Sequence, residues 1–174
     1  MPIVRTRTLY ISPDDDCTAA LLAAAARATA SLHVLIYGFT LAPLADLLIA
    51  KRTAGCTVGV VADHTQAAGH AERPVLQRLV DAGVPVTIAT APSGAILHEK
   101  ALLIDIERGP DHNDSYAVYG SWNFSAGAER QENHLQVDND PSMCALLWRQ
   151  YQEADAVGRA HPAWQLAPSG KEPA

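Results

Sequence analysis

Two apolar, β-branched stretches of the chain enclose a stretch with helical spacing. Residues 31–39 (SLHVLIYGF) and 57–63 (TVGVVAD) show little alternation between apolar and polar positions, and residues 43–54 between them repeat leucine at helical intervals before Gly55. Strands without alternation are typical of a sheet that is covered on both faces. This order of strand, helix and strand predicts an α/β fold.

Further strands and helices are predicted on both sides of this unit. The first half of the chain alternates strand and helix, whereas the second half holds successive strands with little helix between them, which indicates antiparallel pairing. We therefore expect a mixed β-sheet flanked by helices on both faces, an α-β-α sandwich. The expected strands are 8–12, 31–39, 57–63, 84–90, 96–105, 116–123 and 134–138, and the expected helices follow the acidic cluster 14–16 as far as residue 30 and span 43–54, 73–82 and 141–157.

The length of the chain favours one domain. Its 174 residues fall in the range of about 100 to 200 residues that one domain usually takes. A hydrophobic share of 48% with 18% charged residues excludes general disorder and a coiled coil. We expect a single domain over residues 1–160 and a flexible C-terminal tail over residues 161–174.

The charge balance limits how the protein can bind phosphate groups. The chain has 13 Lys and Arg against 19 Asp and Glu, which gives a formal net charge of -6. This is the wrong sign for a protein that holds a polyanion on a broad basic surface. Any phosphate chemistry must therefore be confined to a local site.

Cysteine spacing and hydropathy indicate the compartment. Cys17, Cys56 and Cys144 form no C-x-x-C pair, so neither a disulfide framework nor a zinc knuckle is predicted, and a reducing compartment fits best. No apolar segment follows the N-terminal basic residues, so we expect a cytoplasmic protein, although a cleaved leader would leave no trace.

The longest nearly apolar stretch, 18–30, contains Arg27 and is shorter than the roughly 20 residues of a membrane span. We expect no stable membrane association.

Four polar residues alternate along two consecutive predicted strands. His98 and Lys100 lie two positions apart on one strand, and Ser121 and Asn123 lie two positions apart on the next. Because side chains alternate between the faces of a strand, each pair points to one side, and the pairs converge if the strands are neighbours. An imidazole, a cation, a hydroxyl and an amide together form a set suited to binding and attacking a phosphate ester.

Two acidic residues are assigned to this set in secondary roles. Asp105 lies seven positions after His98 and falls on the opposite face of a regular strand, so we give it a supporting role. Glu132 is the natural carboxylate partner of an imidazole N–H, since such a contact fixes the tautomer and stabilises the imidazolium. A glutamate in water at the start of a strand would have the same sequence context.

Residues 64–72 (HTQAAGHAE) follow a predicted buried strand at its carboxyl end, where ligands collect in open α/β sheets. His64 and Gln66 in this loop are candidate residues of a substrate cleft, although a solvated loop would carry similar residues. Trp122, between the serine and the asparagine above, is a third candidate cleft residue.

These residues, in this order, resemble the phospholipase D superfamily, whose HKD signature is H-x-K-x4-D followed downstream by G-S-x-N. Further segments resemble the small single-motif bacterial endonucleases of that superfamily: TLYISP, SLHVLIYGFT, the D-x-x-Q of 63–66, and ENHLQV. The connection 106–119 is longer than the family usually has, and we interpret its first part as an enlarged hairpin that shapes substrate access. The residues that match the signature are His98, Lys100, Asp105, Gly120, Ser121 and Asn123.

The resemblance implies a phospholipase D-like catalytic domain that cleaves phosphodiesters without a metal or other cofactor. It also implies a homodimer with one composite site, because each chain carries one motif. His98 of one subunit would attack phosphorus to give a phosphohistidine, and the partner's His98 would protonate the leaving alcohol and then activate water. Lys100 and Asn123 would hold the phosphoryl oxygens with help from Ser121, and Gly120 would support the motif.

The substrate class stays open between three readings. We expect an endonuclease that acts on DNA or RNA; the alternatives are a phospholipid or small-molecule phosphodiesterase, and a nucleic-acid-binding dimer without catalysis. A basic amphipathic segment, which a lipid enzyme would be expected to carry, is not evident. Other motifs fail on spacing, since the second His of H-E-x-x-H is Leu102 and the chain contains no G-x-x-x-x-G-K-[ST].

Overall fold

A computed structural model describes residues 5–170 and contains a seven-stranded mixed sheet. The strand order is β1-β7-β6-β5-β2-β3-β4. β2, β3 and β4 are parallel, and every other neighbouring pair is antiparallel. The strands are β1 Arg7–Ser12, β2 Ser31–Ile36, β3 Thr57–Asp63, β4 Val86–Ala89, β5 Lys100–Ile104, β6 Tyr116–Gly120 and β7 Asn133–Asp138.

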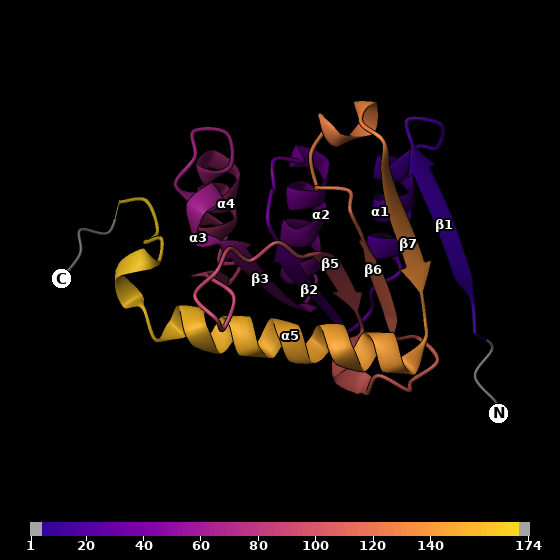
Figure 1. Cartoon of the computed structure of the whole chain (residues 1–174). Coiled ribbons are helices and arrows are strands. Elements are labelled where there is room, and N and C mark those ends of the chain that lie inside the picture. The colour runs from indigo at the N-terminus through magenta and orange to yellow at the C-terminus, as the bar shows by residue number, and fades with distance from the viewer. Residues whose placement is uncertain (1–4, 171–174) are drawn as a thin grey trace.

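Helices cover both faces of this sheet (Figure 1). The α-helices are α1 Cys17–Ala26, α2 Ala42–Thr53, α3 His64–Ala67, α4 Arg73–Asp81 and α5 Pro141–Arg159, and the 3-10 helices are η1 Ile106–Arg108, η2 Ala128–Arg130 and η3 Pro162–Trp164. Buried residues of α1, α2 and α4 form one apolar cluster with one face of the strands. Those of α5 form a second cluster on the other face. The predicted α-β-α sandwich with a mixed sheet is confirmed.

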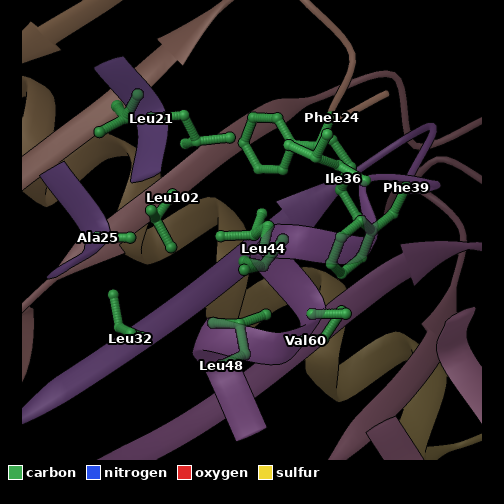
Figure 2. Close-up of a cluster of buried hydrophobic side chains, with 14 of the residues drawn as sticks. Leu21, Ala25, Leu32, Ile36, Phe39, Leu44, Leu48, Val60, Leu102 and Phe124 are labelled. Atoms are coloured by element: carbon green, nitrogen blue, oxygen red, sulfur yellow. The ribbon is translucent and has the colours of Figure 1, made fainter. Parts of the chain in front are cut away.

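The burial of β2 on both faces explains why its sequence lacks alternation. All six residues from Ser31 to Ile36 are buried. Leu32 and Ile36 belong to the cluster with α1 and α2, whereas Leu35 belongs to the cluster with α5. Figure 2 shows the first cluster, in which leucines of α1 and α2 pack against β2, β5 and two phenylalanines. Full burial of each such side chain contributes about 1.5 to 3 kcal/mol to stability.

Aspartate side chains cap the N-terminal ends of α1, α3 and α5. The side chain of Asp16 accepts from the backbone N–H of Ala19 at the start of α1, as the acidic cluster predicts. Asp140 caps α5 in the same way, directly before Pro141. Asp63 caps α3, so part of the expected loop 64–72 is a short helix. An oxygen acceptor at this position satisfies N–H groups that have no partner inside the helix.

The expected tail contacts the body of the domain. The side chain of Gln165 bonds the backbone of Ile88 in β4 with both its oxygen and its nitrogen. Ser169 bonds the carboxylate of Asp81 at the end of α4. These contacts place Gln165 against the edge strand β4 and Ser169 against the end of α4. The tail beyond residue 170 lies outside the described residues.

Candidate active site

The beginning of β5 lies beside the end of β6 because these neighbouring strands are antiparallel. His98 precedes β5, and Ser121 and Asn123 follow β6. The three therefore lie at the edge of the sheet that the strand ends form, and not within the longer strands that the sequence predicts. β2 ends at the same edge, where Ile36 pairs with Lys100. In this sheet the edge is also the carboxyl end of the parallel strands, the usual place for ligands.

A cavity of about 400 Å³ opens at this edge. It gathers the imidazole of His98, the ammonium-bearing Lys100 and the hydroxyl-bearing Ser121, as the strand pattern anticipates, and it adds a second imidazole from β7. Its lining residues are His98, Glu99, Lys100, Tyr119, Gly120, Ser121, His134 and Leu147.

Tyr37 holds the histidine and the lysine in place. Its ring centroid lies 4.6 Å from that of His98, and the Nζ of Lys100 lies 5.0 Å from the same tyrosine centroid. Nζ also donates to the carbonyl oxygen of His98 over 2.8 Å. Lys100 is 4% exposed, and this burial lowers its pKa. A cation that is shielded from water in this way interacts strongly with an anion beside it.

Gly120 allows β7 to approach Ser121 closely. A Cβ atom on Gly120 would lie 2.1 Å from the carbonyl oxygen of His134, so any residue with a side chain would clash there. The same carbonyl accepts from the N–H groups of Ser121 and Trp122. The Ser121 Oγ in turn accepts from the backbone N–H of His134 over 3.0 Å and lies 3.2 Å from its ring Nδ1. His134 is a site residue that the sequence pattern did not single out.

Asn123 lines a second cavity of about 370 Å³, which we call the Glu72 cavity. Tyr37 joins the two cavities, because it lines this one and contacts the histidine of the first. Gln66, an expected cleft residue, lies here and donates to the Tyr37 hydroxyl over 3.0 Å. The lining residues are Tyr37, Gly38, Thr40, Gln66, Gly69, His70, Ala71, Glu72, Asn123 and Ser125.

Glu72 is a buried acid that sequence reasoning missed. It is 4% exposed, and its Oε2 accepts from the backbone N–H of Phe39 over 3.0 Å. Burial raises the pKa of Glu72 to about 7, and the nearby carboxylate of Asp63 adds to this effect. The residue directly precedes α4, where an acid usually lies in water, so nothing in the sequence marks it as buried.

Asp105 lies at the opposite end of β5. Its carboxylate accepts from the backbone N–H groups of Thr29, Ala30 and Ser31 and from the Thr29 hydroxyl, which ties β5 to the start of β2. Burial alone would raise the pKa of Asp105, but these hydrogen bonds outweigh it and lower the pKa.

The enlarged hairpin 106–115 begins at this far end of β5. The length of the strand, about 16 Å, separates it from the cavity. Our interpretation that it shapes access to this site is therefore wrong: antiparallel pairing places the connection between β5 and β6 at the end of the sheet opposite to His98.

The remaining expected residues have different surroundings. Glu132 is exposed and directly precedes β7. Trp122 is fully buried, with its ring centroid 6.2 Å from that of Phe124, so the expectation that it lines a cleft is wrong, because its side chain belongs to the apolar core. His64 packs against Trp164, at 4.5 Å between ring centroids.

The described residues offer neither a metal-binding cluster nor a membrane-spanning helix. Within residues 5–170 there is no group of three or more His, Cys, Asp or Glu side chains that could hold a metal ion. None of the helices in that range has both the length and the apolar character needed to cross a membrane.

A comparison with protein families identifies the one to which the chain is similar. Residues 21–154 match the family described as "Cardiolipin synthase, PLD-like domain". No curated protein sequence matches the chain.

Three solved structures share the fold. Nuc from Salmonella typhimurium, a phospholipase D family member, has 21% identity and a TM-score of 0.77 over 90% of this chain and 97% of its own. NucT from Helicobacter pylori has 18% identity and a TM-score of 0.75 over 88% of this chain and 98% of its own. TrmBL2, an archaeal chromatin protein with a novel mode of DNA binding, has 13% identity and a TM-score of 0.56 over 88% of this chain and 52% of its own.

Proposed function

The chain belongs to the phospholipase D-like family, a family of phosphodiester-cleaving enzymes, and from this premise we propose that it is a metal-independent endonuclease that acts on DNA or RNA. The observation that carries the proposal is the gathering of His98, Lys100 and Ser121 in one cavity, with Asn123 in the adjoining one. A nucleophile, a buried cation and two neutral hydrogen-bonding groups supply what attack on a phosphodiester needs.

The proposed reaction proceeds in two displacements. In the first, an imidazole nitrogen of His98 forms a bond to phosphorus as the bond to the leaving alcohol oxygen breaks, and a second imidazole gives that oxygen a proton. In the second, the imidazole that gave the proton removes one from water, whose oxygen bonds phosphorus as the P–N bond breaks. Lys100, Ser121 and Asn123 stabilise the phosphoryl oxygens throughout.

We propose that the second imidazole is the partner's His98 in a homodimer. An apolar surface beside the site supports this assembly: Leu9 and Ile11 on the edge strand β1 are 52% and 48% exposed. Ile11 pairs with His134 of β7, which lines the cavity. α5 packs against β2 to β6. The part of the same sheet face that β1 forms is therefore available to a second copy of the chain.

The extent of the likeness to small endonucleases favours a nucleic acid over a lipid. The segments that resemble small single-motif endonucleases run through most of the chain, and the two neighbours Nuc and NucT are covered almost completely, over 97% and 98% of their length. The family description, which names cardiolipin synthase, supports a lipid phosphodiesterase as the second candidate. TrmBL2 supports a third, DNA binding without cleavage.

The test is hydrolysis by purified wild type and His98→Ala in excess EDTA. The substrates are plasmid DNA, single-stranded DNA, RNA, cardiolipin vesicles and bis(p-nitrophenyl) phosphate. We expect the wild type to cleave the small ester and at least one nucleic acid, and His98→Ala to cleave none. Cleavage of cardiolipin alone would favour the lipid enzyme, and a salt-dependent DNA complex without cleavage would favour the binding protein.

A further inference from the structure

Two oxygen atoms of the Glu72 cavity lack a hydrogen-bond donor. Within the described residues, Glu72 Oε1 and Asn123 Oδ1 are buried and have no hydrogen-bond partner. The other carboxylate oxygen of Glu72 is bonded to Phe39, which fixes the side chain. A buried acceptor without a donor costs free energy, so both atoms favour an occupant that brings N–H or O–H groups.

The lining of the cavity narrows the chemistry of that occupant. Of the described residues that line it, none is Lys or Arg, and Glu72 is acidic. Of these lining residues only His70 could become a cation, so a second phosphate group would meet an acid without a permanent positive charge. An acyl chain would cover hydroxyl and amide groups, which Thr40, Gln66 and Ser125 contribute. A neutral polar group rich in donors fits this lining.

The position of the cavity relates its occupant to the reacting phosphate. Asn123 is the residue that the family resemblance assigns to the phosphoryl oxygens, and it lines this cavity. Tyr37 contacts His98 and Lys100 on one side and accepts from Gln66 on the other. A group in the Glu72 cavity would therefore lie next to a phosphate held at His98.

We propose that the Glu72 cavity is a subsite for the nucleoside next to the scissile phosphate, held through the N–H and O–H donors of its base and sugar. Glu72 accepts one of these donors and thereby selects substrates that carry a nucleoside. This inference rests on the proposed function and deepens it. Burial, which raises the pKa of Glu72 to about 7, also keeps the cost of an unoccupied acceptor moderate, because the acid can take up a proton.

The test compares esters with and without a nucleoside. The kcat/KM values of wild type and Glu72→Gln are measured for bis(p-nitrophenyl) phosphate and for the dinucleoside phosphates ApA, UpU and d(ApA). We expect Glu72→Gln to lower the ratio of dinucleoside to small-ester kcat/KM by about tenfold, the effect of one lost hydrogen bond to a charged or buried group. ApA against UpU compares the exocyclic amino donor of adenine with the ring N–H donor of uracil, and ApA against d(ApA) isolates the 2′-hydroxyl of the sugar.

Asp114→Asn is the matched control, because it removes the same charge from an exposed loop at the other end of the sheet. It should keep the wild-type ratio. A ratio of dinucleoside to small-ester kcat/KM that stays unchanged in Glu72→Gln, as equal losses on all four esters would leave it, would overturn the subsite. If Glu72→Gln does not fold, Thr40→Val replaces a lining hydroxyl with a methyl group and serves the same comparison.

A binding measurement separates failure of the subsite from failure of the proposed function. Calorimetric titration of His98→Ala protein with ApA requires no turnover. We expect the additional change Glu72→Gln to weaken this binding about tenfold. If the wild type hydrolyses none of the esters, the proposed function fails while this titration still decides the subsite; equal affinities would overturn it.

Discussion

The ring Nδ1 of His134 lies 3.2 Å from the Ser121 Oγ, which also accepts the backbone N–H of His134 over 3.0 Å. A serine hydroxyl has two acceptor positions but a single proton to donate. When Nδ1 carries a proton it donates to Ser121, and the serine proton is free for a phosphoryl oxygen. When Nδ1 carries none, the serine donates to the ring instead. His134 therefore controls where the serine donor points.

We predict that His134→Ala lowers kcat/KM through Ser121. Ser121→Ala should lower kcat/KM by about tenfold, the effect of one hydrogen bond to an anion, and His134→Ala by less. The double variant should match Ser121→Ala, because the histidine acts only through the serine. Additive losses in this double-mutant cycle on bis(p-nitrophenyl) phosphate would show that His134 acts independently.

We predict that one His98→Ala subunit inactivates a dimer. If each composite site needs the imidazoles of both subunits, only homodimers of the wild type turn over. Random mixing of equal amounts by co-expression then leaves about one quarter of the wild-type activity per dimer. Activity of one half would indicate that each subunit works alone. Differently tagged subunits allow the mixed dimer to be isolated and assayed by itself.

We predict that Ile11→Asp dissociates the dimer and abolishes activity. A buried carboxylate without a partner is costly at an apolar interface, whereas Ile11 is 48% exposed in the single subunit, so the subunit itself should remain folded. Leu146→Asp is the matched control, since Leu146 is 40% exposed and lies on α5 rather than on the edge strand β1. Light scattering reports the mass. A monomer that retains full turnover would contradict the composite site.

We predict that Asp105→Asn destabilises the domain without altering its chemistry. The carboxylate accepts N–H groups from three consecutive residues, and an amide would turn one acceptor into a donor against them. The expected loss is about 1 to 3 kcal/mol in the free energy of unfolding, measured in urea. The kcat of the folded fraction should stay at the wild-type value. A large fall in kcat would place Asp105 in the catalytic machinery.

The layered fold follows from local patterns that the sequence displays, whereas the place of β1 beside β7 does not. β2 lies between helices on both faces, and its six buried residues include no exposed position that could produce alternation. The strands 96–105 and 116–123 were predicted too long, because apolar residues such as Leu97 and Trp122 continue the pattern beyond the last ladder pair. Apolar character reports burial there, not strand pairing.

The site could be predicted only where the residues carry a motif. His98, Lys100 and Ser121 share a cavity because two strands happen to be antiparallel neighbours, which their spacing suggests. Glu72 and His134 carry no such signal. Glu72 is buried because the segment after β2 folds over it, and that contact joins residues 33 positions apart. Only the tertiary structure reveals such a contact.

His33 is a buried histidine in the middle of β2, under α5. Its Nε2 lies 3.0 Å from Glu107 Oε1, and its ring packs against Trp148 and Tyr151. Burial lowers the pKa of His33 below its ordinary value of 6.5, although Glu107 and the more distant Asp155 oppose this shift. The ring is therefore held neutral in the folded protein.

We predict that His33 makes the domain less stable in mild acid. The unfolded chain binds a proton at His33 near pH 6.5, whereas the folded chain binds it only at lower pH, so acidification favours unfolding. This part of the stability is fully present above about pH 7 and is lost as the pH falls from 6.5 through the lower folded pKa. Urea unfolding at closely spaced pH values measures it. His33→Gln should flatten the dependence over this window, whereas the exposed His161→Gln should not. An equally steep dependence in His33→Gln would assign the effect to other groups.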